Sequence, residues 1–153
     1  MSVSNKKILS QEDISRLSSE YLNEGRKLED WEITYVEIEE KTLTARVRMR
    51  SHFISPTDSS GFHLTIFSTL EFLSQLTIIH AHVWAGLTDK TMEGWMIECS
   101  ISSKRPIRDP ENIEVRMEVS SIKKLGDNIL SITNSQVTDS GGLFEARLKG
   151  FLS

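Results

Sequence analysis

The spacing of apolar residues alternates along the chain between a helical period and a period of two, and these changes predict its helices and strands. Near the N-terminus, Ser10 followed by Gln-Glu-Asp is typical of a helix N-cap with an acidic first turn. Apolar side chains then recur at helical spacing, at Ile14, Leu17 and Tyr21. We therefore predict a short amphipathic helix over residues 11–24, and we expect residues 1–9 before it to be flexible.

Alternation of apolar and polar residues predicts strands that each bury one face. Two such runs begin at Trp31 and are joined by a short turn at residues 40–42, so they form a hairpin. Four more runs follow Gly86, and turn sequences separate the last of them, Gly-Asp-Asn at 126–128 and Ser-Gly-Gly at 140–142. Because the connections are short, we expect these four strands to form an antiparallel meander.

The longest apolar segment runs from Leu64 to Ala85 and contains neither proline nor glycine. It is too long for a strand and is apolar nearly all round, which predicts a buried helix. Glu71, Gln75 and two histidines interrupt it, and the chain has no second such segment. We therefore do not expect it to cross a membrane.

The order of these elements predicts an α+β fold in one domain, residues 1–153. A sheet of about six antiparallel strands needs a cover for its apolar face, and only the long helix is large and apolar enough to provide it. A sheet curled around one central helix is the arrangement known as the hotdog fold.

Composition and charge limit the partners and the cellular location that we expect for this protein. The net charge is −4 and the basic residues are scattered, which argues against a nucleic-acid partner. The single cysteine, Cys99, cannot form an internal disulfide, and the N-terminus lacks the apolar core of a signal peptide, so we expect a cytoplasmic protein. His80 and His82 are two residues apart and lack the i, i+4 spacing of helical zinc ligands, so we expect no metal site.

Glu71 is the strongest candidate for chemistry, because an ionised carboxylate in apolar surroundings costs several kcal/mol unless it is paired or its pKa shifts. It could deprotonate a water molecule or attack a carbonyl itself. Gln75 follows about one turn later on the same face and could orient Glu71 or the water. A structural alternative pairs Glu71 with Arg46, Arg48 or Lys104, and leaves Gln75 to bond backbone groups.

The junction between loop and helix at Gly61–Thr65 adds a second group of candidates. Its backbone N–H groups and the positive end of the helix dipole could hold a carbonyl and the oxyanion that develops from it. His63 could polarise the same carbonyl, with His52 as its competitor, or could simply cap the helix.

The segment from His52 to Gln75 resembles part of two hotdog families, the acyl thioesterases and the FabZ-like 3-hydroxyacyl-carrier dehydratases. In both, a loop with His and Gly leads into a central helix that carries an acidic residue. The interval of eight residues from His63 to Glu71 is close to that of 4-hydroxybenzoyl-CoA-type thioesterases. Glu71 with Gln75, and the pair His52-Phe53, resemble the dehydratases instead.

A resemblance over more of the chain, from about residue 59 onward, is to fatty acyl-CoA thioesterases of the FcoT type. It rests on four short matches: Ser59-Ser60-Gly61, Gln75-Leu76, Ser103-Lys104-Arg105-Pro106 and Asp139-Ser140-Gly141-Gly142. Two positions depart from that family, because its loop tyrosine falls near Pro56 here and its asparagine before the Gln-Leu pair is Ser74.

These resemblances imply an acyl-CoA or acyl-carrier-protein thioesterase of fatty acid metabolism, with Glu71, His63, Gln75 and His52 as candidate catalytic residues. The substrate-binding set they imply is Gly61 and Phe62 in the loop and Lys104 and Arg105 beyond it, whose cations suit the phosphates of coenzyme A. No cofactor is implied, since coenzyme A or phosphopantetheine is part of the substrate.

Two other functions stay open. One is dehydration of 3-hydroxyacyl thioesters by a His/Glu pair, and the other is a non-catalytic acyl-thioester-binding protein, which the departures at Pro56 and Ser74 motivate. In each case we expect a homodimer or tetramer, because the helix and edge strands are too apolar to stand alone.

Overall fold

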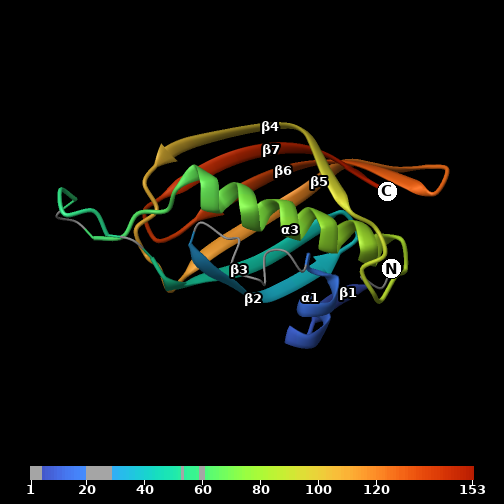
Figure 1. Cartoon of the computed structure of the whole chain (residues 1–153), viewed down its shortest axis with the longest axis horizontal. Helices are drawn as coiled ribbons and strands as arrows, with labels where there is room; N and C mark the ends of the chain where they lie inside the picture. The colour runs from blue at the N-terminus through green and yellow to red at the C-terminus, as the bar shows by residue number, and fades with distance from the viewer. Residues whose placement is uncertain (1–4, 20–28, 53, 59–60) are drawn as a thin grey trace.

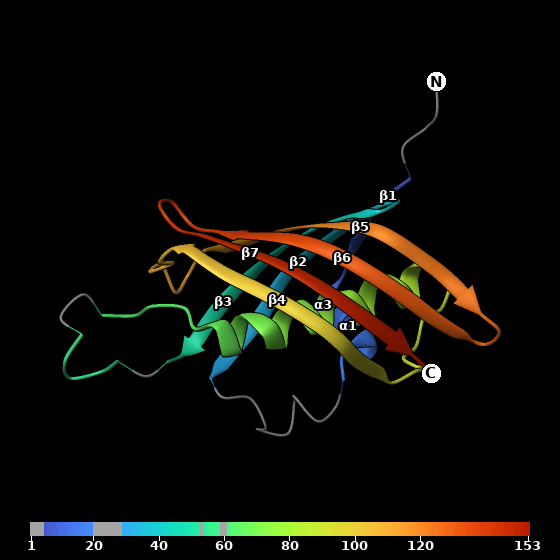
Figure 2. The same ribbon diagram turned by 90° about the horizontal axis from the view of Figure 1, so that it is seen from above.

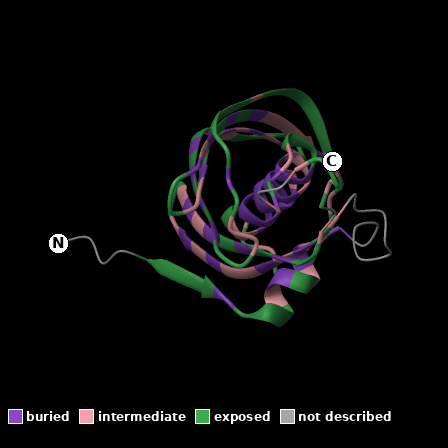
Figure 3. Ribbon diagram, turned by 90° about the vertical axis from the view of Figure 1, so that its left-hand side faces the viewer, coloured by how far each residue is buried: buried purple, intermediate pink, exposed green. Residues whose placement is uncertain are grey.

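Seven antiparallel strands curve around one long helix in the computed structural model, which describes residues 5–19, 29–52, 54–58 and 61–153 (Figure 1). Seen along its length, the sheet forms an incomplete ring with the helix inside and a short helix outside (Figure 3). The elements in chain order are β1 (Lys6–Leu9), α1 (Gln11–Leu17), β2 (Asp30–Glu39), β3 (Thr42–Ser51), α3 (Ile66–Trp84), β4 (Gly94–Arg105), β5 (Ile113–Leu125), β6 (Asn128–Thr138) and β7 (Leu143–Leu152).

The predicted hairpin of β2 and β3 is confirmed, and Glu40 takes a positive φ of 55° in its turn. The predicted meander is wrong in one strand. The sheet order is β1-β2-β3-β5-β6-β7-β4, so β5, β6 and β7 form a meander while β4 pairs with β7 and becomes an edge (Figure 2). Residues 106–112 connect β4 to β5. At about 3.3 Å per residue they can cross three strand spacings of about 4.8 Å, so a short connection does not require neighbouring strands.

The N-terminal region differs from its prediction in two respects. Residues 6–9, which were expected to be flexible, form the edge strand β1 and pair with β2. Helix α1 begins as predicted, with Ser10 and Asp13 in a reciprocal capping box, and ends at Leu17. The rest of the predicted helix, residues 20–24, lies outside the described residues.

Helix α3 is the centre of the core. It lies within the predicted range, and Thr65 is its N-cap. Phe72, Leu73, Leu76 and Ile79 have no exposed surface and pack against the inner faces of the strands. Among the described residues, no helix is long and apolar enough to span a membrane.

The two histidines of α3 bond backbone groups, and no cluster of three metal-ligating side chains occurs in the part of the chain that the structure describes. His80 Nε2 lies 3.0 Å from the Glu40 carbonyl oxygen. His82 Nδ1 lies 2.8 Å from the Ile78 carbonyl oxygen, and its Nε2 accepts the N–H groups of Thr91 and Met92. Because Nε2 accepts, the network assigns His82 as neutral with its proton on Nδ1.

We predict that acidification destabilises the fold through His82. Burial lowers the pKa of His82 from 6.5, and Lys90 lowers it further, against the opposing effects of the Ile78 carbonyl and Glu93. The unfolded chain therefore takes up its proton first, so the contribution of neutral His82 is complete above about pH 6.5 and declines as the pH falls below it. His82→Ala should lower the free energy of unfolding by about 2 kcal/mol at pH 8, because two N–H groups lose their acceptor.

Denaturant melts of the parent and of His82→Ala between pH 5 and 8 measure this. The difference in unfolding free energy should shrink below pH 6.5. A difference for His82→Ala that is independent of pH would contradict the assignment.

Candidate active site

A cavity of about 290 Å³ lies between α3 and the strands β4 and β7. The helix contributes five residues to its wall: Leu70, Glu71, Ser74, Thr77 and Ile78. Facing them are the first residues of β4 and the last residues of β7, among them Gly94, Met96, Gly150 and Leu152. The wall is mostly apolar, and Glu71 is its only carboxylate among the described residues.

Glu71 is half-buried and held from one side. The indole N–H of Trp31 donates a hydrogen bond of 3.0 Å to Glu71 Oε1. Trp31 is itself 4% exposed, and its ring packs edge-on against Phe72 at 6.0 Å between centroids. A carboxylate has about four acceptor positions, so a single indole donor orients Glu71 and leaves other positions for water or substrate.

The predicted alternative of a salt bridge does not occur within the described chain. Arg48 pairs with Glu32 at 2.8 Å, Arg46 lies over the ring of Tyr35, and Lys104 is exposed at the far end of β4. Lys149 also lines the cavity, but Glu71 forms no ion pair among the described residues. Glu71 is therefore a carboxylate without a cationic partner in the described chain, at the wall of a mostly apolar cavity.

Gln75 bonds a backbone group, as the structural alternative predicts. Its Oε1 accepts the Ser19 N–H at 2.8 Å, while its Nε2 has no hydrogen-bond partner among the described residues. Four residues advance the helix by about 400°, so Gln75 is turned about 40° from Glu71. This turn takes it out of the cavity wall and under the chain that follows α1.

Neither candidate histidine lines the cavity. His63 is exposed, and its Nδ1 lies 2.9 Å from Asp58 Oδ2. His52 packs edge-on against Phe62 at 4.7 Å between centroids, and its buried Nδ1 has no hydrogen-bond partner among the described residues. Neither of the two alternative pairs, His63 with Glu71 or His52 with Glu71, is therefore brought together at this cavity within one chain.

The loop-to-helix junction offers fewer free donors than expected. Gly61, at a positive φ of 85°, donates its N–H to the Asp58 carbonyl, and the Leu64 N–H donates to the Ile107 carbonyl. Thr65 satisfies two more donors, because its Oγ1 accepts the Ser68 N–H and its carbonyl accepts the Thr69 N–H. The positive end of the helix dipole also lies at this end of α3.

The Asp139-Ser-Gly-Gly segment braces the connection that follows β4. The Asp139 carboxylate accepts the N–H groups of Arg108, Asp109, Gly141 and Gly142. Partial burial alone would raise the pKa of Asp139, but these four backbone donors hold it below its ordinary value. Lys104 is exposed close by, and Arg105 donates to the Gly141 carbonyl at 3.2 Å.

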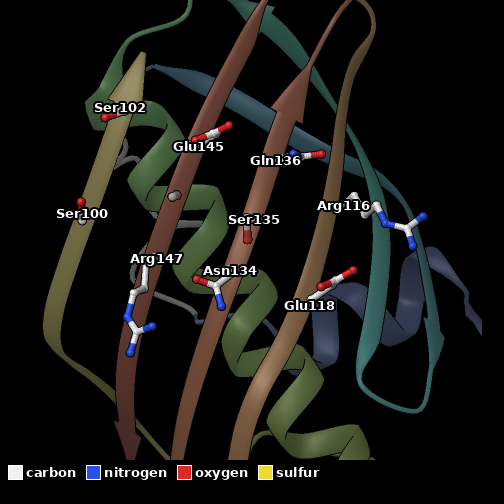
Figure 4. A pocket seen from close by; sticks show the side chains of 10 residues that line it. Ser100, Ser102, Arg116, Glu118, Asn134, Ser135, Gln136, Glu145 and Arg147 are labelled. Carbon is white, nitrogen blue, oxygen red and sulfur yellow. The ribbon is translucent and has the colours of Figure 1, made fainter. Parts of the chain in front are cut away.

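A larger hollow of about 520 Å³ lies on the outer face of the sheet, across β4 to β7 (Figure 4). Its charged side chains alternate in sign, with Arg116 and Glu118 on one strand and Glu145 and Arg147 on another. Polar outward faces are ordinary in antiparallel sheets that bury only one side. This hollow is therefore unsuited to an acyl chain, and the smaller cavity beside Glu71 is the candidate active site.

Comparisons with known proteins find similarity in structure but not in sequence. No protein-family model matches the chain, and no curated protein sequence matches it. Solved structures do match. The Streptococcus pneumoniae hypothetical thioesterase with coenzyme A is 10% identical, with a TM-score of 0.51 over 81% of this chain and 86% of that one. Streptococcus mutans smu.793, bound to acetyl-CoA, is 12% identical, with a TM-score of 0.53 over 87% and 96%.

A third structure, yhdA of Lactococcus lactis, is 8% identical and has a TM-score of 0.51 over 97% of this chain and 92% of that chain. Together with the sheet order around α3, these similarities show that the chain has the hotdog fold, as predicted. Identities this low show the fold alone.

We predict that Gln75 stabilises the fold without taking part in chemistry. In Gln75→Ala the buried Ser19 N–H loses its acceptor, which should lower the free energy of unfolding by about 1–3 kcal/mol. Urea melts of this variant and of Ser74→Ala, one residue away on the cavity wall, make the comparison. A Gln75→Ala variant as stable as the parent would contradict this role.

Proposed function

We propose that this protein is a thioesterase that hydrolyses acyl thioesters of coenzyme A or an acyl carrier protein, in the cytoplasm and within fatty acid metabolism. The observation that carries the proposal is the position of Glu71, a carboxylate oriented by Trp31 at the wall of an apolar cavity. Support comes from the coenzyme A and acetyl-CoA bound to two solved structures with this fold.

In the proposed reaction, the acyl chain enters the cavity and places its thioester beside Glu71. Glu71 removes a proton from a water molecule, the water oxygen bonds to the carbonyl carbon, and the carbon–sulfur bond breaks. The proton then passes from Glu71 to the departing thiolate. Direct attack by Glu71, followed by hydrolysis of the anhydride, uses the same geometry. The dipole at the start of α3 is the proposed source of oxyanion stabilisation.

Within one chain, the cavity offers what hydrolysis needs and only half of what dehydration needs. A dehydratase needs an acid and a base that both reach the substrate, and neither His52 nor His63 of the same chain lines the cavity with Glu71, so dehydration would require a histidine from a second copy. Hydrolysis needs one general base and a water molecule, which Glu71 can serve alone.

We also propose that the active unit is a homodimer joined through β4. This strand lies at the edge of the sheet, and Trp95, Met96 and Ile97 are 62%, 38% and 51% exposed there. A long, apolar, unpaired edge is a template for pairing with a second chain. Antiparallel pairing along the whole of β4 would bring Lys104 and Arg105 of one copy beside the cavity of the other, where they could bind the phosphates of the substrate.

Glu71→Gln should lower the rate of thiol release from acyl-CoA by about 10²–10⁴-fold, because the amide cannot accept the proton of the water. A thiol-reactive dye follows the reaction, and the melting temperature reports whether the variant folds. Ser74→Ala, from the same cavity wall, should retain most of the activity.

Three outcomes would contradict the proposal. If Glu71→Gln hydrolyses as fast as the parent, Glu71 has no catalytic role. If the parent binds acyl-CoA and raises its melting temperature without turnover, the protein is a binding protein. If a 3-hydroxyacyl-CoA yields enoyl absorbance, the protein is a dehydratase.

Ile97→Lys should convert the dimer into a monomer, because a charge on an edge strand opposes strand pairing. Light scattering after size exclusion should give twice 17.4 kDa for the parent and 17.4 kDa for the variant. Leu125→Lys is the matched control, since Leu125 is also exposed, at 45%, but ends β5. A parent that is monomeric at micromolar concentration would refute the dimer.

A further inference from the structure

The cavity beside Glu71 extends along α3 and has a closed end. On the helix, its wall runs from Leu70 and Glu71 to Thr77 and Ile78. On the strands, Leu148 is opposite Cys99, Gly150 is opposite Met96, and Leu152 is opposite Gly94. Ile78 clusters with Leu152 and is 5% exposed, so these residues close the end that lies farthest from Glu71.

Gly94 completes this closed end. A Cβ at Gly94 would lie 2.8 Å from Cγ1 and 2.9 Å from Cδ1 of Ile78, closer than real carbon atoms approach. The Ile78 side chain therefore lies directly against the Gly94 backbone, and no space continues between them.

Gly150, in the middle of the cavity wall, has room for a side chain. A Cβ there would lie 3.8 Å from Thr77 Cγ2 and 3.9 Å from the Trp95 carbonyl oxygen, which are ordinary contacts. Gly150 also lacks the positive φ that Gly61 and Gly86 need. Neither backbone strain nor crowding therefore requires a glycine at this position. The glycine leaves open space in the wall between Leu148 and Leu152.

We propose that this cavity takes a linear saturated acyl chain of about eight to ten carbons, and that Gly150 and Ile78 set its length. This inference rests on the proposed function, since it assigns the acyl group of that substrate. The seven residues from Glu71 to Ile78 span about 10 Å of helix. A zigzag chain with C–C bonds of about 1.5 Å advances about 1.3 Å per bond, which gives about eight bonds, or about nine carbons.

The volume leads to a similar length. A methylene group occupies about 30 Å³, close to the share of one water molecule in the liquid, so 290 Å³ holds at most about ten carbons. Each methylene that enters the cavity should tighten binding about fourfold, and methylenes beyond the closed end should add little.

The test measures binding of saturated acyl-CoAs from four to fourteen carbons to the Glu71→Gln protein, in which turnover is blocked. Affinity should rise about fourfold per methylene and level off at eight to ten carbons. Gly150→Val should move this limit down by two to three carbons, because it adds three carbons to the wall. Ile78→Ala should move the limit up by a similar amount, because it removes three.

Arg147→Val is the matched control, because it introduces the same side chain on the outer face of the same strand and should leave the limit unchanged. If Ile78→Ala does not fold, Ile78→Val should still move the limit up by one carbon. Equal affinity for all chain lengths, or a limit that neither Gly150→Val nor Ile78→Val shifts, would overturn the inference.

The same series measured as hydrolysis by the Glu71-containing protein separates this inference from the proposed function. A chain-length limit in binding without any thiol release would refute the thioesterase and leave the inference standing. Thiol release at equal efficiency for all lengths would leave the thioesterase standing and refute the inference.

Discussion

Enclosure of α3 by the sheet is the constraint on which the rest of the structure depends. A helix inside a curved sheet must find a partner for each polar side chain it carries, because an unpaired polar group there costs about 1–3 kcal/mol. His80 and His82 each bond backbone groups, and Gln75 Oε1 accepts the Ser19 N–H, although His80 Nδ1 and Gln75 Nε2 have no hydrogen-bond partner among the described residues. Glu71 differs from them, because its single indole donor leaves acceptor positions that face a cavity.

Most of the fold could be predicted from the sequence because it depends on local periodicity. The hairpin of β2 and β3 follows from the alternation of apolar residues, and α3 lies within an apolar segment that is too long for a strand and contains neither proline nor glycine. The position of β4 could not be predicted, because periodicity identifies a strand but not its neighbour in the sheet. Strand β1 was missed because only one of its four residues, Leu9, is buried, which leaves no alternation to detect.

The candidate site was predictable only in part, for the same physical reason. Glu71 is conspicuous in an apolar segment, whereas Trp31 is one aromatic residue in an alternating strand, and nothing in the sequence brings it to Glu71 across 40 residues. Gly150 also gives no signal in the sequence, because its importance comes from the empty space around it in the folded chain. His63 and His52 did give a signal in the sequence, because they lie in a segment that resembles known families. The structure nevertheless does not place them in the cavity wall.

The most direct test of this account is a crystal structure of the Glu71→Gln protein with an octanoyl-CoA analogue whose sulfur-linked carbonyl is replaced by a methylene. We expect the acyl chain to lie along α3 toward Ile78, with that methylene in contact with the side chain at position 71. An acyl chain bound elsewhere, for example over the charged outer face of the sheet, would contradict it.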